Sequence, residues 1–274
     1  MERLTQVLRR KDQSGEPLPD FLSALHNSGV RFRRAQTVLI VGQPGAGKSM
    51  LALFAALKSK VRTLYISADT DSKTMLWRAA ACVMQTPVNE VASMVGTSAD
   101  SLVEEALQEV DRHVVFDWTS NPRLSDIELE TLAAEEAWGA FPQMIVIDNL
   151  MNVINDEGGD DYSGMRHSMQ AFHTLARKTG AAVLVLHHAS LNRTKEGEPA
   201  PMNAIIGQVS ALPEMILSVM LDDQSYKVAV VKNRHAKANA GGNRQIELAA
   251  SPETMTLFND HGERRLAESR REWS

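Results

Sequence analysis

The stretch TVLIVGQPGAGKS, residues 37–49 of the 274-residue chain, joins an apolar run to a glycine-rich turn. The run at 37–41 is rich in β-branched residues and apolar on both faces, which is typical of a central strand in a parallel sheet. The turn at 42–49 fits the pattern G-x-x-x-x-G-K-[ST], and a helical pattern follows it directly. A strand before this motif and a helix after it predict a phosphate-binding loop.

Chemistry assigns a role to each part of this loop. Glycines let backbone N–H groups turn inward around a phosphate, and the helix N-terminus adds partial positive charge. Lys48 can reach the β- and γ-phosphates of a nucleotide, and the Ser49 hydroxyl can ligate Mg²⁺. The residues expected to contact the nucleotide are Gly42, Gln43, Pro44, Gly45, Ala46, Gly47, Lys48, Ser49 and Met50.

Further apolar runs alternate with helical patterns along the chain. This alternation predicts a three-layer α/β domain with a mostly parallel sheet. After residue 213 the runs are joined by short turns, which predicts an antiparallel extension. The runs of the first kind are RTLYIS (62–67), HVVFDW (113–118), MIVID (144–148) and AVLVLH (182–187); those of the second kind are EMILSVML, SYKVAVVK, RQIELAA and TMTLF.

The composition fits one globular domain with short appendages, because 43% of the residues are hydrophobic and 23% are charged. We expect the domain at 31–260, after a polar segment at 1–30 and before a charged tail at 261–274. The tail is expected to be a frayed, solvated end.

Composition also bears on partners and compartment. The net charge of −5 argues mildly against a protein held to nucleic acid by its overall field, although a local basic surface is compatible with it. The single cysteine, Cys82, is expected to be a small core residue and fits a reducing cytoplasm. The charged start and the lack of an apolar run of ~20 residues predict neither a signal peptide nor a membrane span, so we expect a cytoplasmic protein.

Acidic residues follow two of the apolar runs. The run MIVI ends in Asp148, and ligands of parallel sheets bind at the carboxyl ends of the strands. Asp148 is therefore expected to hold magnesium through water, opposite Ser49. The stretch YISADTD places Asp69 and Asp71 after another run, where each could activate the attacking water or cap the helix that begins near Ser72. We favour Asp69 as the catalytic acid and Asp71 as the cap.

The ordered set of motifs resembles RecA-fold ATPases, and DnaB-type replicative helicases most of all. The similarity lies in ISADTDSKTMLWRAA, MIVIDNLMNVI, HHASLNR and KNR, and it covers most of 30–250; HHAS is also similar to the small plasmid RepA-type hexameric helicases. Asn149 stands where many ring-forming ATPases carry the water-activating acid, and Asp69 stands where the resembled family has a glutamate. An aspartate is one methylene shorter, so its oxygens retreat by ~1.5 Å. Misplacement on the ~1 Å scale can cost ~100-fold in rate.

The resemblance implies roles for basic residues near two strand ends. His188, rather than His187, would read the γ-phosphate and couple it to a DNA loop; the alternative is a hydrogen-bonded core histidine. Lys232 and Arg234 flank Asn233, so both side chains would point to one face of a strand. In the resembled family such a pair crosses to the next subunit's γ-phosphate; the alternative is a solvated basic strand end.

In RecA-fold proteins the loops after the metal strand and after the sensor strand face the central DNA. The first such loop, 155–164, carries four acids, which repel phosphate. The second, 190–204, carries Arg193 and Lys195, which fit contact with a DNA backbone. Both could instead be mobile surface loops, and we favour DNA contact for the second.

As a whole, the resemblance implies an ATP- and Mg²⁺-dependent motor that forms a ring, expected to be a hexamer, and translocates on single-stranded DNA to unwind a duplex. The segment 1–30 resembles the linker that packs on a neighbouring subunit, and replication proteins would be candidate partners. Two alternatives stay open. One is a RecA- or RadA-like recombinase that forms filaments, and the other is a nucleotide-gated DNA-binding module with weak hydrolysis.

Overall fold

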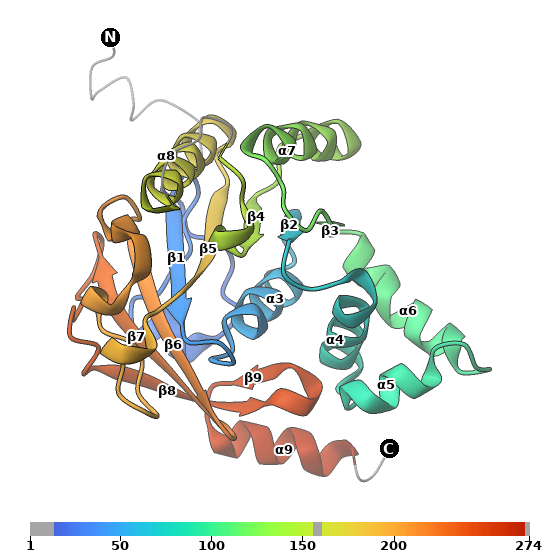
Figure 1. Cartoon of the computed structure of the whole chain (residues 1–274). Helices are drawn as coiled ribbons and strands as arrows, with labels where there is room; N and C mark the ends of the chain where they lie inside the picture. The colour runs from blue at the N-terminus through green and yellow to red at the C-terminus, as the bar shows by residue number, and fades with distance from the viewer. Residues whose placement is uncertain (1–13, 156–160, 272–274) are drawn as a thin grey trace.

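The computed structural model of the chain describes residues 14–155 and 161–271. Within these residues nine strands form one sheet in the order β3-β2-β4-β5-β1-β6-β7-β8-β9 (Figure 1). The strands are β1 (Thr37–Gly42), β2 (Thr63–Ser67), β3 (Val114–Asp117), β4 (Met144–Asp148), β5 (Ala182–His188), β6 (Met215–Asp222), β7 (Ser225–Asn233), β8 (Gln245–Ser251) and β9 (Thr256–Phe258).

Strand direction divides the sheet into two parts. All pairs from β3 to β6 are parallel, and the pairs β6–β7, β7–β8 and β8–β9 are antiparallel. The predicted mostly parallel sheet with antiparallel C-terminal strands is therefore confirmed. One detail differs from the expectation: β6 pairs with β1 in parallel, so the antiparallel part begins only at β7.

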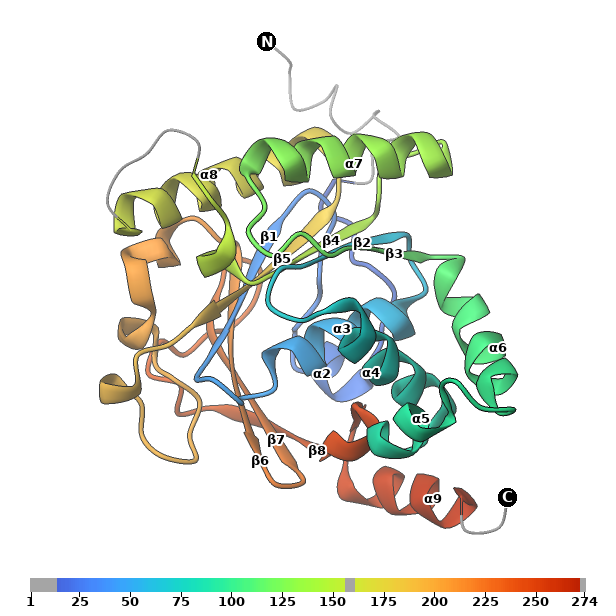
Figure 2. The same cartoon turned by 45° about the vertical axis from the view of Figure 1, so that its right-hand side comes forward.

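Helices cover both faces of the sheet. Figure 2 shows α7 and α8 along one face and α3 and α4 against the other, which is the predicted three-layer arrangement. The α-helices are α2 (Ser23–Asn27), α3 (Lys48–Ser59), α4 (Ser72–Met84), α5 (Val88–Met94), α6 (Asp100–Asp111), α7 (Leu124–Trp138), α8 (Asp161–Thr179) and α9 (His261–Arg271). The 3₁₀ segments are η1 (Leu150–Asn152), η2 (Leu191–Arg193), η3 (Met202–Ala204), η4 (Ile206–Ala211) and η5 (Pro252–Thr254).

The side chains of β1 explain why both faces need a cover. All six residues of β1 are buried. Successive side chains of a strand point to opposite faces, and accordingly Val38 and Ile40 join the apolar cluster around α3. Leu39 and Val41 join the cluster that contains Phe172 of α8. The strand that carries the phosphate loop is thus fixed between two helical layers.

The segment before β1 packs on the same core. Leu25 of α2 is 1% exposed and belongs to the cluster around α3. The backbone N–H of Ala24 donates to the side chain of Asn259, which follows β9. Residues 14–30 therefore pack on the chain's own domain. The packing of the whole segment on a neighbouring subunit stays a prediction, and residues 1–13 lie outside the described residues.

The C-terminal segment forms a helix, so the expectation of a frayed end is wrong for residues 261–271. The helix α9 lies beside β8 and β9 (Figure 1). Arg264 is only 8% exposed, and its Nε donates to Glu268 at 2.7 Å one turn later. Cys82 is a free, buried cysteine, as expected for a core residue. Within 14–155 and 161–271, none of the helices has the length and apolar character that crossing a bilayer requires.

Candidate nucleotide-binding site

The predicted phosphate loop lies between β1 and α3. Gly47 caps α3 with a φ of 80°, a left-handed conformation that glycine adopts without strain. A Cβ on Gly47 would also lie 2.6 Å from the ring of Tyr226. The buried Tyr226 hydroxyl donates to the Gly47 carbonyl at 2.9 Å. Tyr226 belongs to β7, far away in the sequence, so a motif search along the chain misses this support of the loop.

A cleft of ≈ 440 Å³ opens at the carboxyl edge of the sheet beside this loop. It brings together five residues predicted from the sequence as site residues: Lys48, Ser49, Asp69, Asp148 and His188. Residues that the sequence reasoning missed also line it, namely Thr70, Arg78, Asn149, Leu221, Pro252 and Met255. The lining of the cleft also includes Pro44, Gly45, Gly47 and Met50. Their contact with a nucleotide stays a prediction, as it does for Gly42, Gln43 and Ala46.

Lys48 is held inside the loop. Its Nζ donates to the carbonyl oxygens of Gly42 at 3.3 Å and of Gln43 at 3.0 Å, and it lies 3.4 Å from Nδ1 of His188. Burial lowers the pKa of Lys48, while the nearby carboxylates of Asp148 and Asp69 raise it. The ammonium thus faces two acids within one cleft, where it can balance their charge or that of a phosphate.

Asp148 and Ser49 form the candidate metal position. Asp148 is 2% exposed and accepts a hydrogen bond from the Tyr65 hydroxyl at 2.9 Å. Burial raises the pKa of Asp148, and hydrogen bonds from Ser49 and Tyr65 oppose that rise. A carboxylate bonded to a hydroxyl at a strand end fits Mg²⁺, which takes few protein oxygens and keeps phosphate and water as its other ligands. Tyr65 orients the carboxylate and was not identified from the sequence.

The structure separates the two acids of the stretch YISADTD. Asp71 is the N-cap of α4: its side chain accepts from the backbone N–H groups of Lys73 and Thr74, each at 3.0 Å. These and the Thr74 hydroxyl lower the pKa of Asp71. The predicted capping role of Asp71 is therefore confirmed. Asp69 instead lines the cleft, and its backbone N–H donates to the Asp148 carbonyl at 3.2 Å.

The two histidines at the end of β5 face different surroundings. His188 lines the cleft beside Lys48, and burial, followed by the Lys48 charge, lowers its pKa. His187 is fully buried, and its Nε2 lies 2.9 Å from the carbonyl of Ile206 in η4. Burial lowers the pKa of His187 to about 4. The geometry agrees with the choice of His188 as the residue that faces a phosphate, and it assigns His187 to the anchoring of η4.

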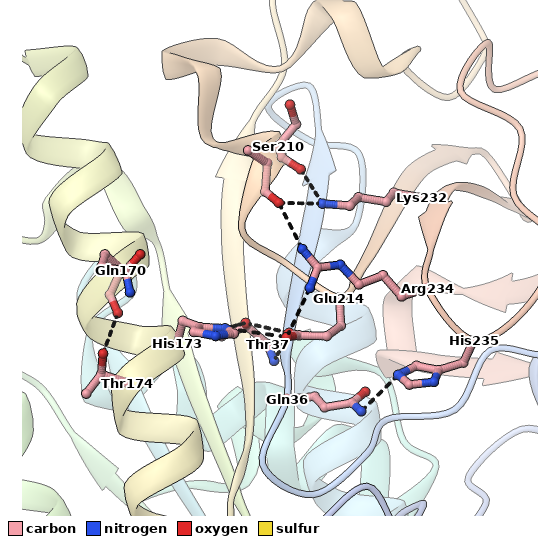
Figure 3. Close-up of polar contacts among 11 residues, drawn as sticks. Gln36, Thr37, Gln170, His173, Thr174, Ser210, Glu214, Lys232, Arg234 and His235 are labelled. Atoms are coloured by element: carbon pink, nitrogen blue, oxygen red, sulfur yellow. Dashed lines mark hydrogen bonds and ion pairs between the residues drawn. The ribbon is translucent and has the colours of Figure 1, made fainter.

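Lys232 and Arg234 lie at the opposite edge of the sheet (Figure 3). Asn233 pairs with Met215, and Met215 pairs with Val38 at the start of β1. The end of β7 is thus displaced from the phosphate loop by about four residues, roughly 13 Å along the strand direction. Both cations point the same way, as predicted, because both donate to the carbonyl of Ala211.

The loop 190–204 is partly ordered by short helical turns. Nη1 of Arg193 donates to the Asn203 carbonyl at 3.1 Å across the loop. Arg193 and Lys195 line a cavity of ≈ 630 Å³. Its other side is formed by Gly241, Gly242, Asn243 and Gln245. In the other expected loop, 155–164, residues from Asp161 onward belong to α8, and residues 156–160 lie outside the described residues.

Comparison with known proteins matches residues 29–194 to the AAA_25 family, an AAA domain. The chain is 35% identical over 265 residues to the Gene 65 protein of Mycobacterium phage L5, which covers 94% of this chain and 98% of that protein. It is 33% identical over 228 residues to the Gene 65 protein of Mycobacterium phage D29, with coverage of 80% and 97%. It is 26% identical over 179 residues to the DNA repair protein RadA of Brucella abortus, with coverage of 63% and 32%.

Solved structures share the fold at low sequence identity. The structure of a helicase ATPase domain superposes with a TM-score of 0.76 at 15% identity, which covers 93% of this chain and 95% of that one. The structure of a DnaB-like replicative helicase, studied with its interactions with primase, gives a TM-score of 0.75 at 14% identity, with coverage of 93% and 66%. The expected RecA-like fold, with its resemblance to the DnaB type, is thereby confirmed.

Proposed function

This chain belongs to the AAA_25 family, and from that premise we propose that it is an ATP-dependent, ring-forming motor that translocates on single-stranded DNA. The P-loop fold shared with DnaB-like helicase ATPase domains supports nucleotide binding and ATPase activity. A hexameric ring, unwinding of duplex DNA and contact with replication proteins are parts of the same proposal.

One observation carries the proposal: the cleft and the pair of cations lie at opposite edges of one sheet. Asp69, Lys48 and Asp148 share the cleft at the carboxyl edge, whereas Lys232 and Arg234 lie at the amino edge. A cation pair so placed is suited to reach the cleft of a second copy stacked head to tail. Head-to-tail contacts that close generate rings.

The residues of the cleft have separate roles in the proposed hydrolysis. Lys48 binds the β- and γ-phosphates, and Ser49 and Asp148 hold Mg²⁺, which neutralises phosphate charge. Asp69 orients the attacking water and accepts its proton. His188 donates to the γ-phosphate and reports its presence to the segment that follows β5.

The neighbouring copy and the DNA complete the proposed motor. Lys232 and Arg234 of one copy stabilise the charge that develops on the γ-phosphate held by the next, an effect worth ~10³ to 10⁵ in rate for an arginine finger. Arg193 and Lys195 contact the phosphates of single-stranded DNA, so binding weakens as salt rises. The lack of a base-reading requirement in such contacts makes the motor insensitive to DNA sequence.

Steady-state ATPase with and without single-stranded DNA, combined with electron microscopy of the ATP-bound particle, tests this proposal. We expect turnover to rise with DNA, closed rings to form, and a forked duplex to be unwound. Turnover without any response to DNA would contradict a DNA motor.

A recombinase is the second candidate, because the chain is 26% identical to RadA over 179 residues. This reading predicts open helical filaments and strand exchange instead of rings and unwinding, so the same micrographs decide between the two. A nucleotide-gated binding module is the third reading. It is motivated by Asp69 in the position where the resembled family has a glutamate, and it predicts DNA binding that depends on ATP with negligible hydrolysis.

A further inference from the structure

Glu214 is a buried acid directly before β6, outside the nucleotide cleft. Its side chain is 8% exposed. Oε2 accepts hydrogen bonds from the backbone N–H and from the hydroxyl of Thr37, each at 2.9 Å. Oε1 lies 3.4 Å from Nδ1 of His173 on α8. The carboxylate is thus fixed to the first residue of β1 and to the helix above it (Figure 3).

The same carboxylate faces the two cations that end β7. Nη1 of Arg234 lies 3.9 Å from Oε1 of Glu214, and Nη2 donates to the Ala211 carbonyl at 3.3 Å. Nζ of Lys232 donates to the carbonyls of Ser210 and Ala211, each at 2.7 Å. The last carbonyls of a helical turn lack partners within it, so η4 offers acceptors at its end for both cations.

Two like charges side by side repel each other unless an acid lies close. The pKa of Lys232 is lowered by burial and by the charge of Arg234, and Glu214 opposes that shift. Glu214 is therefore the carboxylate that compensates the pair. The next residue, His235, lies 2.9 Å through Nε2 from Nε2 of Gln36. Gln36 and Thr37, at the start of β1, thus both contact the segment around the end of β7, one directly and one through Glu214.

We infer that Glu214 is a positioning residue for Arg234 and Lys232. Because Thr37 and His173 hold the carboxylate rigidly, the guanidinium is aimed in one direction while half of it remains exposed. The strand that anchors Glu214 is β1, which ends at the chain's own phosphate loop. The inference rests on the proposed action of the pair on a neighbouring copy, and it adds the residue that orients the pair.

A double-mutant cycle tests this inference on the full-length assembled protein. The variants are Glu214→Gln, Arg234→Ala and the combination, with Glu214→Asp as the conservative change and Glu247→Gln as a control at an exposed glutamate of β8. Measurements are kcat and KM of the DNA-stimulated ATPase, the affinity for a fluorescent ATP analogue, and the melting temperature. Glutamine keeps an oxygen for the Thr37 N–H but removes the charge that faces Arg234.

We expect Glu214→Gln to lower kcat on the order of 10²-fold, the cost of misplacing a catalytic group by about 1 Å, with unchanged analogue affinity. The combined variant should be no slower than Arg234→Ala alone, and Glu214→Asp should recover part of the rate. Effects that multiply, or a wild-type kcat for Glu214→Gln, would overturn the inference while leaving the trans role intact. A wild-type kcat for Arg234→Ala would instead contradict the trans role itself. If Glu214→Gln fails to fold, Glu214→Asp replaces it in the same cycle.

Discussion

The two edges of the sheet hold their charged residues in different ways. At the carboxyl edge Lys48, Asp148 and Asp69 face one another in a cleft, and burial shifts the pKa of both Lys48 and Asp148. At the amino edge Lys232 and Arg234 lie at the surface, bound to backbone carbonyls and to a single acid. The first arrangement has the parts of a phosphate site. The second has cations but no cleft at the same place among the described residues, and this difference is the reason for assigning it to a neighbouring copy.

The largest effect is expected at the carboxyl edge. Lys48→Ala removes the ammonium that binds the β- and γ-phosphates, so turnover should fall to background. The matched control is Lys58→Ala, because Lys58 is an exposed lysine of the same helix, α3. Steady-state ATPase with DNA measures both. Residual turnover within about tenfold of wild type for Lys48→Ala would show that another residue binds the phosphates.

The next effect in size is expected at the amino edge. Arg234→Ala should reduce kcat by on the order of 10³ to 10⁵, the range of an arginine finger. Analogue affinity of the dissociated chain should stay unchanged, since Arg234 is remote from its own cleft. A loss of affinity in the dissociated chain, measured by fluorescence titration, would place Arg234 in the cis site and remove the contrast between the edges.

Within the carboxyl edge, Asp69 and Asp71 form a matched pair of acids. Asp69→Asn should lower kcat by ~10²- to 10⁴-fold with little change in affinity, because it removes the general base. Asp71→Asn weakens the cap of α4, so it should lower the melting temperature by roughly 2–4 °C without a comparable loss of rate. Equal ATPase rates for wild type and Asp69→Asn would move the water-activating role to another residue.

The smallest effect concerns stability and pH. The pKa of His187 is about 4 in the folded chain, below its ordinary value of 6.5. The unfolded chain therefore binds the proton first, so stability is complete above pH 6.5 and falls as pH drops toward 4. The loss attributable to His187 is up to about 3 kcal/mol.

Denaturant unfolding of wild type and His187→Gln between about pH 7 and 4 measures this loss. Glutamine keeps an N–H for the Ile206 carbonyl but does not titrate, so the variant should show a shallower decline. His261→Gln, at an exposed position of α9, is the control. Parallel curves for wild type and His187→Gln would contradict a neutral, buried His187.

Local patterns in the sequence were sufficient to predict most of the fold and the main residues of the cleft. The phosphate loop is one continuous motif, and parallel strands bring their carboxyl ends to a common edge, so Asp69 and Asp148 could be placed beside Lys48. The different positions of Asp69 and Asp71 depended only on distance from the start of α4. These predictions needed no knowledge of long-range contacts.

The contacts that were missed all come from elements that are distant in the sequence. Tyr226 reaches Gly47 from β7, and Tyr65 reaches Asp148 across β2 and β4. Glu214 carries no local motif, and its meaning depends on strand register. The helix α9 was missed because its exposed charges outweigh the few residues that it buries, which composition alone reads as a solvated end.

Mixing two inactive variants is the most direct test of the claim that each active site is completed by a second copy. Lys48→Ala lacks the phosphate ligand but keeps Arg234, and Arg234→Ala lacks the cation but keeps Lys48. In a mixed assembly, some interfaces contain an intact Lys48 from one copy and an intact Arg234 from the next. We predict that mixing and reassembling the two variants restores a measurable fraction of DNA-stimulated ATPase, whereas no recovery at any mixing ratio, with mixed assembly verified, would contradict the account.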